Sequence, residues 1–254
     1  MGVNIEVLLS PAEYQSRRER SFTGATCVVF DVLRATSVMI TGLANGAQSF
    51  IPVEEISEAL TWKSRHQDLL LAGERDGLRI QNAAGSGIDF DLGNSPREYR
   101  RDRIAGRNIV TTTTNGTRAL RTCVTAEIVV VGSFLNLTAT TQWLRQRQIS
   151  DLMLVCAGTG PLPALEDILC AGALVDLWLQ AKTETELSDA AKLALLAYRD
   201  AAPQLTAAIG NSQNGARLLA NPDLRDDVAF CLQRDVYPLV AALGRDGKIS
   251  PTGG

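Results

Sequence analysis

Polar residues suited to binding a phosphate group follow directly on a short apolar run in the segment NIVTTTTNGTRAL. The run Asn108–Val110 is typical of a strand, whereas Asn115-Gly116 breaks a strand and Ala119-Leu120 begins a helical pattern. A hairpin would need a second strand after Asn-Gly, and the sequence that follows favours a helix. A strand, a polar turn and a helix N-terminus in succession form the place where α/β proteins hold anions.

Carboxylates and arginines occur in similar turns elsewhere in the chain. The run TCVVF is followed by Asp31 and Arg34, the run DLLLAG by Glu74, and the run DLMLV by CAGTG and then by Glu166-Asp167. Because the carboxyl ends of parallel strands meet at one edge of a sheet, we expect these turns to lie together. Such a set of hydroxyls, N–H groups, guanidiniums and carboxylates suits an oxyanion with a hard divalent cation.

Each of these turns also has a purely structural interpretation. Thr36-Ser37 would cap the helix that follows, Asn115–Thr117 would form a cap and turn, and Glu166-Asp167 would complement a helix dipole. Glu74 and Arg75 would form an ion pair in a solvated turn. The gathering of several carboxylates favours an enzyme, because a protein that only senses an anion gains nothing from acids beside its ligand.

The bulk composition narrows the class of protein. The chain has 254 residues and a formal net charge of −3, which argues against nucleic acid as the main partner. No apolar stretch is long enough to span a membrane and no signal peptide is visible, so a cytoplasmic protein without membrane contact is expected. Five scattered cysteines without a CxxC pair predict reduced, buried thiols. A lone histidine, His66, makes histidine triads and histidine-rich metal centres improbable.

The hydrophobic pattern predicts an α/β fold. Strands are expected at residues 3–9, 26–30, 47–53, 68–73, 107–112, 127–133 and 151–158, with helices between them at residues 36–46, 54–66, 115–123 and 136–148. Alternating elements predict one three-layer α/β/α domain over residues 1–254, with a mainly parallel or mixed sheet. Residues 165–240 read almost wholly as helix, and residues 76–107 as a long functional loop.

Seven of the turns, taken in order, resemble one known family. The motifs DVLRATS, GE-R, GNSP, TTTNGT, GSFLN, CAGT and ED-x-x-CAG follow one another as in the 2-phosphosulfolactate phosphatase family, and SQNGARLL…DDVAFCLQRD resembles its closing motif. The resemblance extends from about Asp31 to Asp235. It implies an α/β/α fold, a homodimer, no organic cofactor, and Mg²⁺-dependent hydrolysis of (2R)-phospho-3-sulfolactate, a small anionic substrate.

The turns and the resemblance together give a hypothesis for the site. The expected catalytic residues are Asp31, Arg34 and Glu166, and the expected Mg²⁺ ligands are Asp31, Glu74, Glu166 and Asp167. The expected substrate-binding residues are Asn94, Ser95, Thr113, Thr114, Asn115, Gly116, Thr117, Arg118, Ser133 and Asn136.

The nucleophile stays open at this point. Asp31 could attack and form an aspartyl-phosphate, or a metal-activated water could attack with Asp31 or Glu166 as base; the missing DxD pattern favours the water. A phosphatase for another small phosphate ester and a non-catalytic anion sensor are the alternative functions. A nucleotide-binding enzyme is less favoured, because no GxxxxGK[ST] loop occurs.

Overall fold

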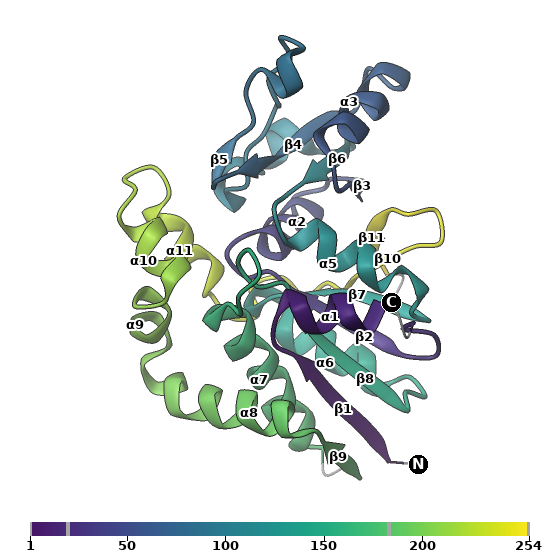
Figure 1. The fold of residues 1–254 in the computed structure, drawn as a ribbon, viewed down its shortest axis with the longest axis vertical. Helices are drawn as coiled ribbons and strands as arrows, with labels where there is room; N and C mark the ends of the chain where they lie inside the picture. Colours follow the sequence, from purple (N-terminus) through teal and green to yellow (C-terminus); the bar gives the residue numbers. More distant parts are fainter. Residues whose placement is uncertain (1, 19–20, 182–183, 253–254) are drawn as a thin grey trace.

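The computed structural model describes residues 2–18, 21–181 and 184–252 and shows a layered α/β fold (Figure 1). The strands are β1 (Val3–Leu8), β2 (Thr26–Phe30), β3 (Ser49–Pro52), β4 (Leu70–Arg75), β5 (Leu78–Arg79), β6 (Asn108–Thr112), β7 (Ile128–Gly132), β8 (Asp151–Cys156), β9 (Thr185–Leu187), β10 (Ala241–Leu243) and β11 (Ile249–Pro251). The helices are α1 (Pro11–Arg18), α2 (Ala35–Ala44), α3 (Ile56–Arg65), α4 (Arg101–Ile104), α5 (Gly116–Thr122), α6 (Leu137–Arg145), α7 (Leu165–Leu179), α8 (Asp189–Ala201), α9 (Leu205–Gly210), α10 (Gln213–Leu219) and α11 (Arg225–Cys231).

The sheet is mixed and consists of two parallel blocks joined by a hairpin. Its strand order is β5-β4-β6-β3-β11-β10-β7-β2-β8-β1-β9. Strands β4, β6 and β3 are mutually parallel, and so are β7, β2, β8, β1 and β9. The hairpin β10–β11 pairs antiparallel with β7 on one side and with β3 on the other. The last strands of the chain therefore connect two blocks built from earlier segments.

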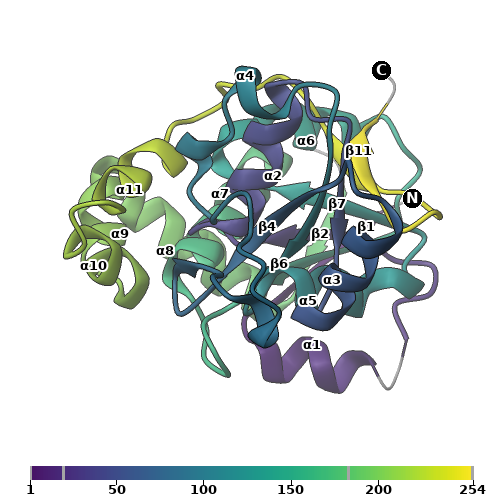
Figure 2. The ribbon, with the colours of Figure 1, turned by 90° about the horizontal axis from the view of Figure 1, so that it is seen from above.

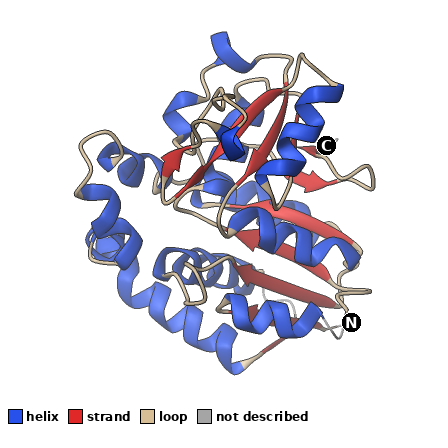
Figure 3. Cartoon of the chain, turned by 45° about the horizontal axis from the view of Figure 1, so that its top comes forward, coloured by secondary structure: helices blue, strands red, loops and turns tan. Residues whose placement is uncertain are grey.

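Alternating side chains of the interior strand β2 show why helices cover both faces of the sheet. In β2, Val28 and Phe30 belong to a core shared with α6, α7 and α8, whereas Cys27 and Val29 belong to a core shared with α1, α2 and α5. A strand buried on both faces reads as a continuous apolar run, as TCVVF does. Figure 3 shows the strands running between helices on either side. The predicted three-layer α/β architecture is confirmed.

The C-terminal helices form an arm that returns to the sheet. Helix α8 packs along α7, and α9, α10 and α11 follow at one side of the molecule (Figures 1 and 2). A Cβ on Gly172 would lie 2.1 Å from the carbonyl oxygen of Ala194, so the close contact of α7 with α8 requires a glycine there. The arm thereby brings α10 and α11 close to the ends of the strands.

The structure corrects three expectations about secondary structure. The segment after residue 165 is not wholly helical, because β9 lies within it and pairs with β1. The hairpin β10–β11 was not expected, since each strand has only three residues and shows too little alternation to be recognised. The loop 76–107 contains β5 and α4. The seven predicted strands are all present, with ends that shift by up to two residues.

All five cysteines are buried free thiols, as predicted. In the described residues, none of the helices has the length and apolar character needed to cross a bilayer.

Candidate functional site

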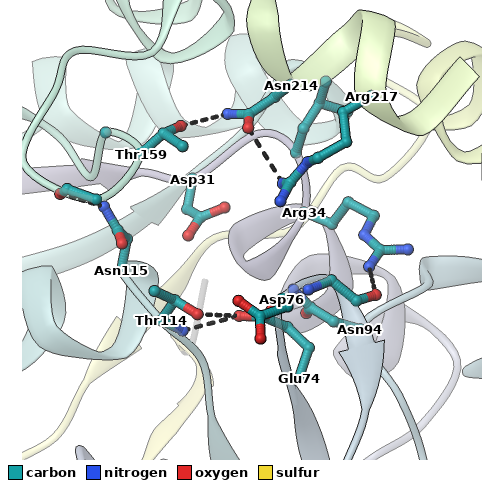
Figure 4. Close-up of a pocket in the computed structure, with 14 residues that line it drawn as sticks. Asp31, Arg34, Glu74, Asp76, Asn94, Thr114, Asn115, Thr159, Asn214 and Arg217 are labelled. Atoms are coloured by element: carbon teal, nitrogen blue, oxygen red, sulfur yellow. Dashed lines mark hydrogen bonds between the residues drawn. The ribbon is translucent and has the colours of Figure 1, made fainter. Parts of the chain in front are cut away.

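A cavity of about 260 Å³ lies where turns from both parallel blocks meet α10 (Figure 4). It is lined by Asp31, Leu33, Arg34, Glu74, Asp76, Gly77, Asn94, Thr114, Asn115, Gly158, Thr159, Gly160, Asn214 and Arg217. The lining residues come from the turns after β2, β4, β6 and β8, from the segment that precedes η2 (Pro96–Glu98), and from α10. The expectation that the polar turns lie together is met for these four strands.

Asp31 is held at the start of α2 and faces the cavity. Its Oδ1 accepts a hydrogen bond of 3.0 Å from the backbone N–H of Ala35, and its own N–H donates to the Thr36 hydroxyl at 3.1 Å. Burial, together with the nearby carboxylates Glu74 and Glu166, raises the pKa of Asp31 to about 7, against the opposing effects of the Ala35 hydrogen bond and of Arg34. A carboxyl group with this pKa can both take and give a proton near neutral pH.

The turn after β6 is shaped so that its backbone passes close to Asp31. Thr113 and Thr117 bond one another reciprocally, each hydroxyl accepting from the other's N–H at 3.1 Å. A Cβ on Gly116 would lie 2.5 Å from Asp31 Oδ2, so only glycine fits there without displacing the carboxylate. Thr114 and Asn115 line the cavity from this turn.

Glu74 joins the turn after β4 to the turn after β6. Its Oε1 accepts hydrogen bonds from the N–H and the hydroxyl of Thr114, at 2.8 and 2.9 Å, and its Oε2 accepts from the N–H of Gly77 at 2.7 Å. Asp76 lies between Glu74 and Gly77 in sequence and also lines the cavity. Glu74 is buried and fixes the shape of one wall, whereas Asp76 is exposed to solvent.

Arg34 is a buried guanidinium held by residues outside its own turn. Its Nη1 donates to Asp227 Oδ2 at 2.7 Å, and its Nη2 donates to the carbonyl of Gly77 at 2.7 Å. Asp227 is fully buried on α11 and also accepts from Ser95 and from Arg97, both at 2.7 Å. This network fastens the helical arm to the site.

Glu166 and Asp167 lie behind the cavity rather than on its wall. Asp167 accepts the backbone N–H groups of Val32 and Gly158, at 2.8 and 3.0 Å, and so ties the turn after β2 to the turn after β8. Glu166 accepts from Asn214 at 2.6 Å and from Ser212 at 3.2 Å. Burial, with Glu166 and Asp31 nearby, raises the pKa of Asp167 well above its ordinary value.

The donor set at the cavity decides whether Mg²⁺ fits. In the part of the chain that the structure describes, no three acidic, histidine or cysteine side chains converge into a closed metal cage. Mg²⁺ is commonly bound by one or two carboxylates, with water and substrate phosphate oxygens completing the octahedron. Asp31 with Glu74 or Asp76, all on the cavity wall, meets that requirement. The residues present therefore fit Mg²⁺ as an ion shared with the substrate.

The structure separates the predicted substrate-binding residues into three groups. Asn94, Thr114 and Asn115 line the cavity, and Gly116 adjoins Asp31. Ser95, Thr113 and Thr117 are buried and bonded to protein groups beside the cavity. Ser133 and Asn136 form a capping box, and Arg118, half exposed, lines an adjoining pocket with Tyr14 and Pro161.

Sequence reasoning passed over some residues of the site. Asn214 and Arg217 lie on the cavity wall, and Asp227 holds Arg34. The signal that could have found them was the motif SQNGARLL…DDVAF, which was recognised but carried no assigned residue. Asp76 and Thr159 also line the cavity, next to residues already singled out.

Comparison with known proteins agrees with these motifs. A family model described as 2-phosphosulpholactate phosphatase matches residues 12–246. A protein of Thermotoga petrophila, named probable 2-phosphosulfolactate phosphatase, is 40% identical over 218 residues, which cover 86% of this chain and 88% of the relative. Proteins with the same name from Caldicellulosiruptor saccharolyticus and Clostridium perfringens are 36% and 35% identical, over 92% and 94% of this chain and 95% and 92% of their own lengths. The matched region includes every turn that lines the cavity.

Proposed function

The chain belongs to the 2-phosphosulfolactate phosphatase family, and from this we propose that it hydrolyses (2R)-phospho-3-sulfolactate to 3-sulfolactate and phosphate with Mg²⁺. Its class, a phosphoric monoester hydrolase, is the class of its relatives. The observation that carries the proposal is the family match over residues 12–246, whose strand-end turns line one cavity around Asp31. That cavity, at about 260 Å³, suits a small ligand.

The residues around the cavity suggest how phosphoryl transfer proceeds. Phosphoryl transfer is mainly a matter of positioning and of neutralising charge. Thr114 and Asn115 lie on the wall beside Asp31, and both shape that wall: the Thr114 hydroxyl donates to Glu74, and the Asn115 amide nitrogen donates to the carbonyls of Ala157 and Gly160. Arg34 adds a fixed positive charge at the base of this wall.

Two schemes for the nucleophile remain candidates. In the first, Asp31 takes a proton from an attacking water, which forms the new P–O bond as the ester oxygen leaves with the bonding electron pair and is protonated to the alcohol. In the second, the Asp31 carboxylate attacks phosphorus while the ester oxygen leaves with the bonding electron pair and is protonated to the alcohol. Water then attacks the aspartyl-phosphate at phosphorus, which releases phosphate and regenerates the carboxylate. Leu33 stands where a DxD pattern would carry a second aspartate, and this absence favours the first scheme.

Mg²⁺ belongs to the proposal as an ion held by Asp31 with Glu74 or Asp76. When bound, it would neutralise charge on the phosphoryl oxygens and lower the pKa of a coordinated water. Glu166 and Asp167, which were expected as further ligands, would support this ion from behind the cavity. Glu166 accepts a hydrogen bond from Asn214, and Asp167 accepts from two backbone N–H groups of the turns after β2 and β8. Both carboxylates thereby hold the cavity walls in place.

The first experiment measures phosphate released from racemic phosphosulfolactate by the purified protein at mildly acidic pH, with Mg²⁺ or with EDTA. We expect release that depends on Mg²⁺. A panel of other small phosphate esters tests the alternative substrate class in the same assay. If neither phosphosulfolactate nor any ester of the panel releases phosphate, the protein is better explained as a non-catalytic anion binder.

Two further features belong to the proposal: a homodimer, which the family implies, and a cytoplasmic location, which the sequence led us to expect. We expect a homodimer, which light scattering coupled to gel filtration would measure, and a cytoplasmic location, which fractionation of the source cells would measure. A monomer at micromolar concentration would contradict the first expectation.

A further inference from the structure

The two arginines on the cavity wall differ in their surroundings. Arg34 is 3% exposed, its Nη1 donates to the carboxylate of Asp227, and its Nη2 donates to the Gly77 carbonyl. Arg217 is exposed on α10, and its one hydrogen bond to the described part of the chain goes from Nη2 to Asn214 Oδ1, at 3.2 Å. Among the described residues, none of the carboxylates forms an ion pair with Arg217. A guanidinium at a cavity wall without an anionic partner is available to an anionic ligand.

The position of Arg217 is fixed by a chain of hydrogen bonds. The Asn214 amide nitrogen donates to Glu166 Oε1 at 2.6 Å and to Thr159 Oγ1 at 2.5 Å. With its nitrogen engaged on that side, Asn214 presents its Oδ1 to Arg217. Figure 4 shows Arg217 reaching into the cavity from α10, facing the space beside Asp31. The guanidinium is therefore oriented before a ligand arrives.

Charge is divided between the walls of the cavity. Asp31, Glu74 and Asp76 lie on the turns of the sheet, where the charge of Arg34 is balanced by Asp227, whereas Arg217 lies on the helical arm. The proposed cation and the phosphoryl group belong with the carboxylates. A second acid group on the substrate would meet repulsion there and attraction at Arg217.

We propose that Arg217 binds the acid group that the substrate carries beside its phosphoryl group. The enzyme thereby selects phosphate monoesters with a second anionic group over neutral ones. This inference rests on the proposed function and extends it by naming a specificity residue. A planar guanidinium suits both a carboxylate and a sulfonate, and the choice between them is an outcome of the test.

The test compares four esters that differ by one acid group at a time. They are phosphosulfolactate, 2-phospholactate without the sulfonate, 2-phosphooxypropane-1-sulfonate without the carboxylate, and isopropyl phosphate with neither. For R217M we expect kcat/KM to fall about 10- to 100-fold with phosphosulfolactate and with the analogue that keeps the bound acid group, and less than about threefold with isopropyl phosphate. R217K keeps the charge without the fork and should recover part of the loss.

The matched control is R225M, which removes an exposed arginine of α11 that does not line the cavity. It should leave all four kcat/KM values unchanged. An equal loss of kcat/KM by R217M with all four esters overturns the inference, because Arg217 would then act on the phosphoryl group that they share. No loss with any ester also overturns it, because Arg217 would then make no contact that matters for turnover.

A binding measurement separates this inference from the proposed function. Calorimetric titration with 3-sulfolactate, which carries the acid groups but no phosphoryl group, needs no turnover. Wild-type binding that R217M weakens about tenfold or more supports the role of Arg217 even if no ester is hydrolysed. Equal affinity of wild type and R217M for 3-sulfolactate contradicts that role whatever the assay of phosphate release shows.

Discussion

The carboxylate of Asp227 accepts a hydrogen bond of 2.7 Å from the guanidinium of Arg34, although the two residues lie 193 positions apart in the chain. Both side chains are almost completely buried. Asp227 comes from the helical arm and Arg34 from the turn after β2, so the pair joins the arm to the site. Removing one partner of such a buried pair strongly lowers the free energy of unfolding, because the other charge is left buried and unpaired.

The first prediction concerns this pair. Replacing Asp227 with Ala should lower the free energy of unfolding by about 3–5 kcal/mol, since the Arg34 guanidinium would keep its burial and lose its counter-charge. Urea unfolding of the metal-free protein measures the change. The matched control is Asp226→Ala, which removes a neighbouring carboxylate that is 67% exposed and lies 3.5 Å from Arg97. That loss should stay below about 1 kcal/mol. Equal effects of the two substitutions would contradict the importance of the buried pair.

The second prediction concerns the pH dependence of stability. The pKa of Asp31 rises from 3.8 to about 7 on folding, so between these values the folded state binds more protons than the unfolded state. The stability of the metal-free protein should therefore fall as pH rises from 5 to 8, with about 3 kcal/mol as the upper limit for Asp31 alone over that range. Asp167, whose pKa is also raised, acts in the same direction.

The variant Asp31→Asn tests that prediction and the catalytic role together. It should unfold at a higher temperature than wild type at pH 8 in EDTA, show a flatter dependence on pH, and release no phosphate. The exposed Asp68→Asn serves as control and should match wild type in both measurements. If the dependence of stability on pH were the same for Asp31→Asn and wild type, burial would not raise the pKa of Asp31. Near-normal turnover of the variant would exclude Asp31 from the mechanism.

The third prediction concerns Mg²⁺. An ion bound among Asp31, Glu74 and Asp76 stabilises the folded state by about 2.7 kcal/mol when its concentration is 100 times its Kd. We expect Mg²⁺ to raise the unfolding temperature of wild type at pH 8, because it also neutralises the carboxylates that repel one another there. Asp31→Asn should lose most of this increase, whereas Asp68→Asn should keep it. An increase that is the same in all three proteins would place the ion elsewhere.

Local pattern was enough to predict the strands and the turns that end them. A buried parallel strand shows itself as an apolar run, and a polar turn after it is visible without knowledge of the fold. Ser133 and Asn136 were predicted to bind substrate, whereas in the structure they form a capping box, whose Ser-x-x-Asn spacing is visible in the sequence.

Relationships between distant segments could not be read in the same way. Nothing in the spacing of Asp227 indicates Arg34 as its partner, and nothing near Asn214 indicates Glu166. The hairpin β10–β11 lies between β7 and β3, which are both more than 100 residues earlier in the chain. These contacts depend on how the arm packs, which a local pattern does not encode.

The last prediction concerns Gly116, where the backbone passes Asp31. A Cβ at this position would lie 2.5 Å from Asp31 Oδ2 and 2.7 Å from the Cβ of Ala35, so Gly116→Ala must displace the carboxylate or the turn. Overpacking of this kind costs about 1–3 kcal/mol of stability. We expect kcat to fall at least about tenfold at a temperature where the variant is fully folded, because a small misplacement of a reacting group is costly.

The control for Gly116 is Gly2→Ala, whose Cβ would meet its nearest neighbour at 3.4 Å, an ordinary contact distance. It should retain wild-type kcat and stability. Circular dichroism at the assay temperature checks that Gly116→Ala is folded, so that lost activity reports on the site rather than on unfolding. A Gly116→Ala protein with wild-type kcat would show that the position of Asp31 tolerates such a shift, and would weaken its assignment as the group that acts directly on the reacting atoms.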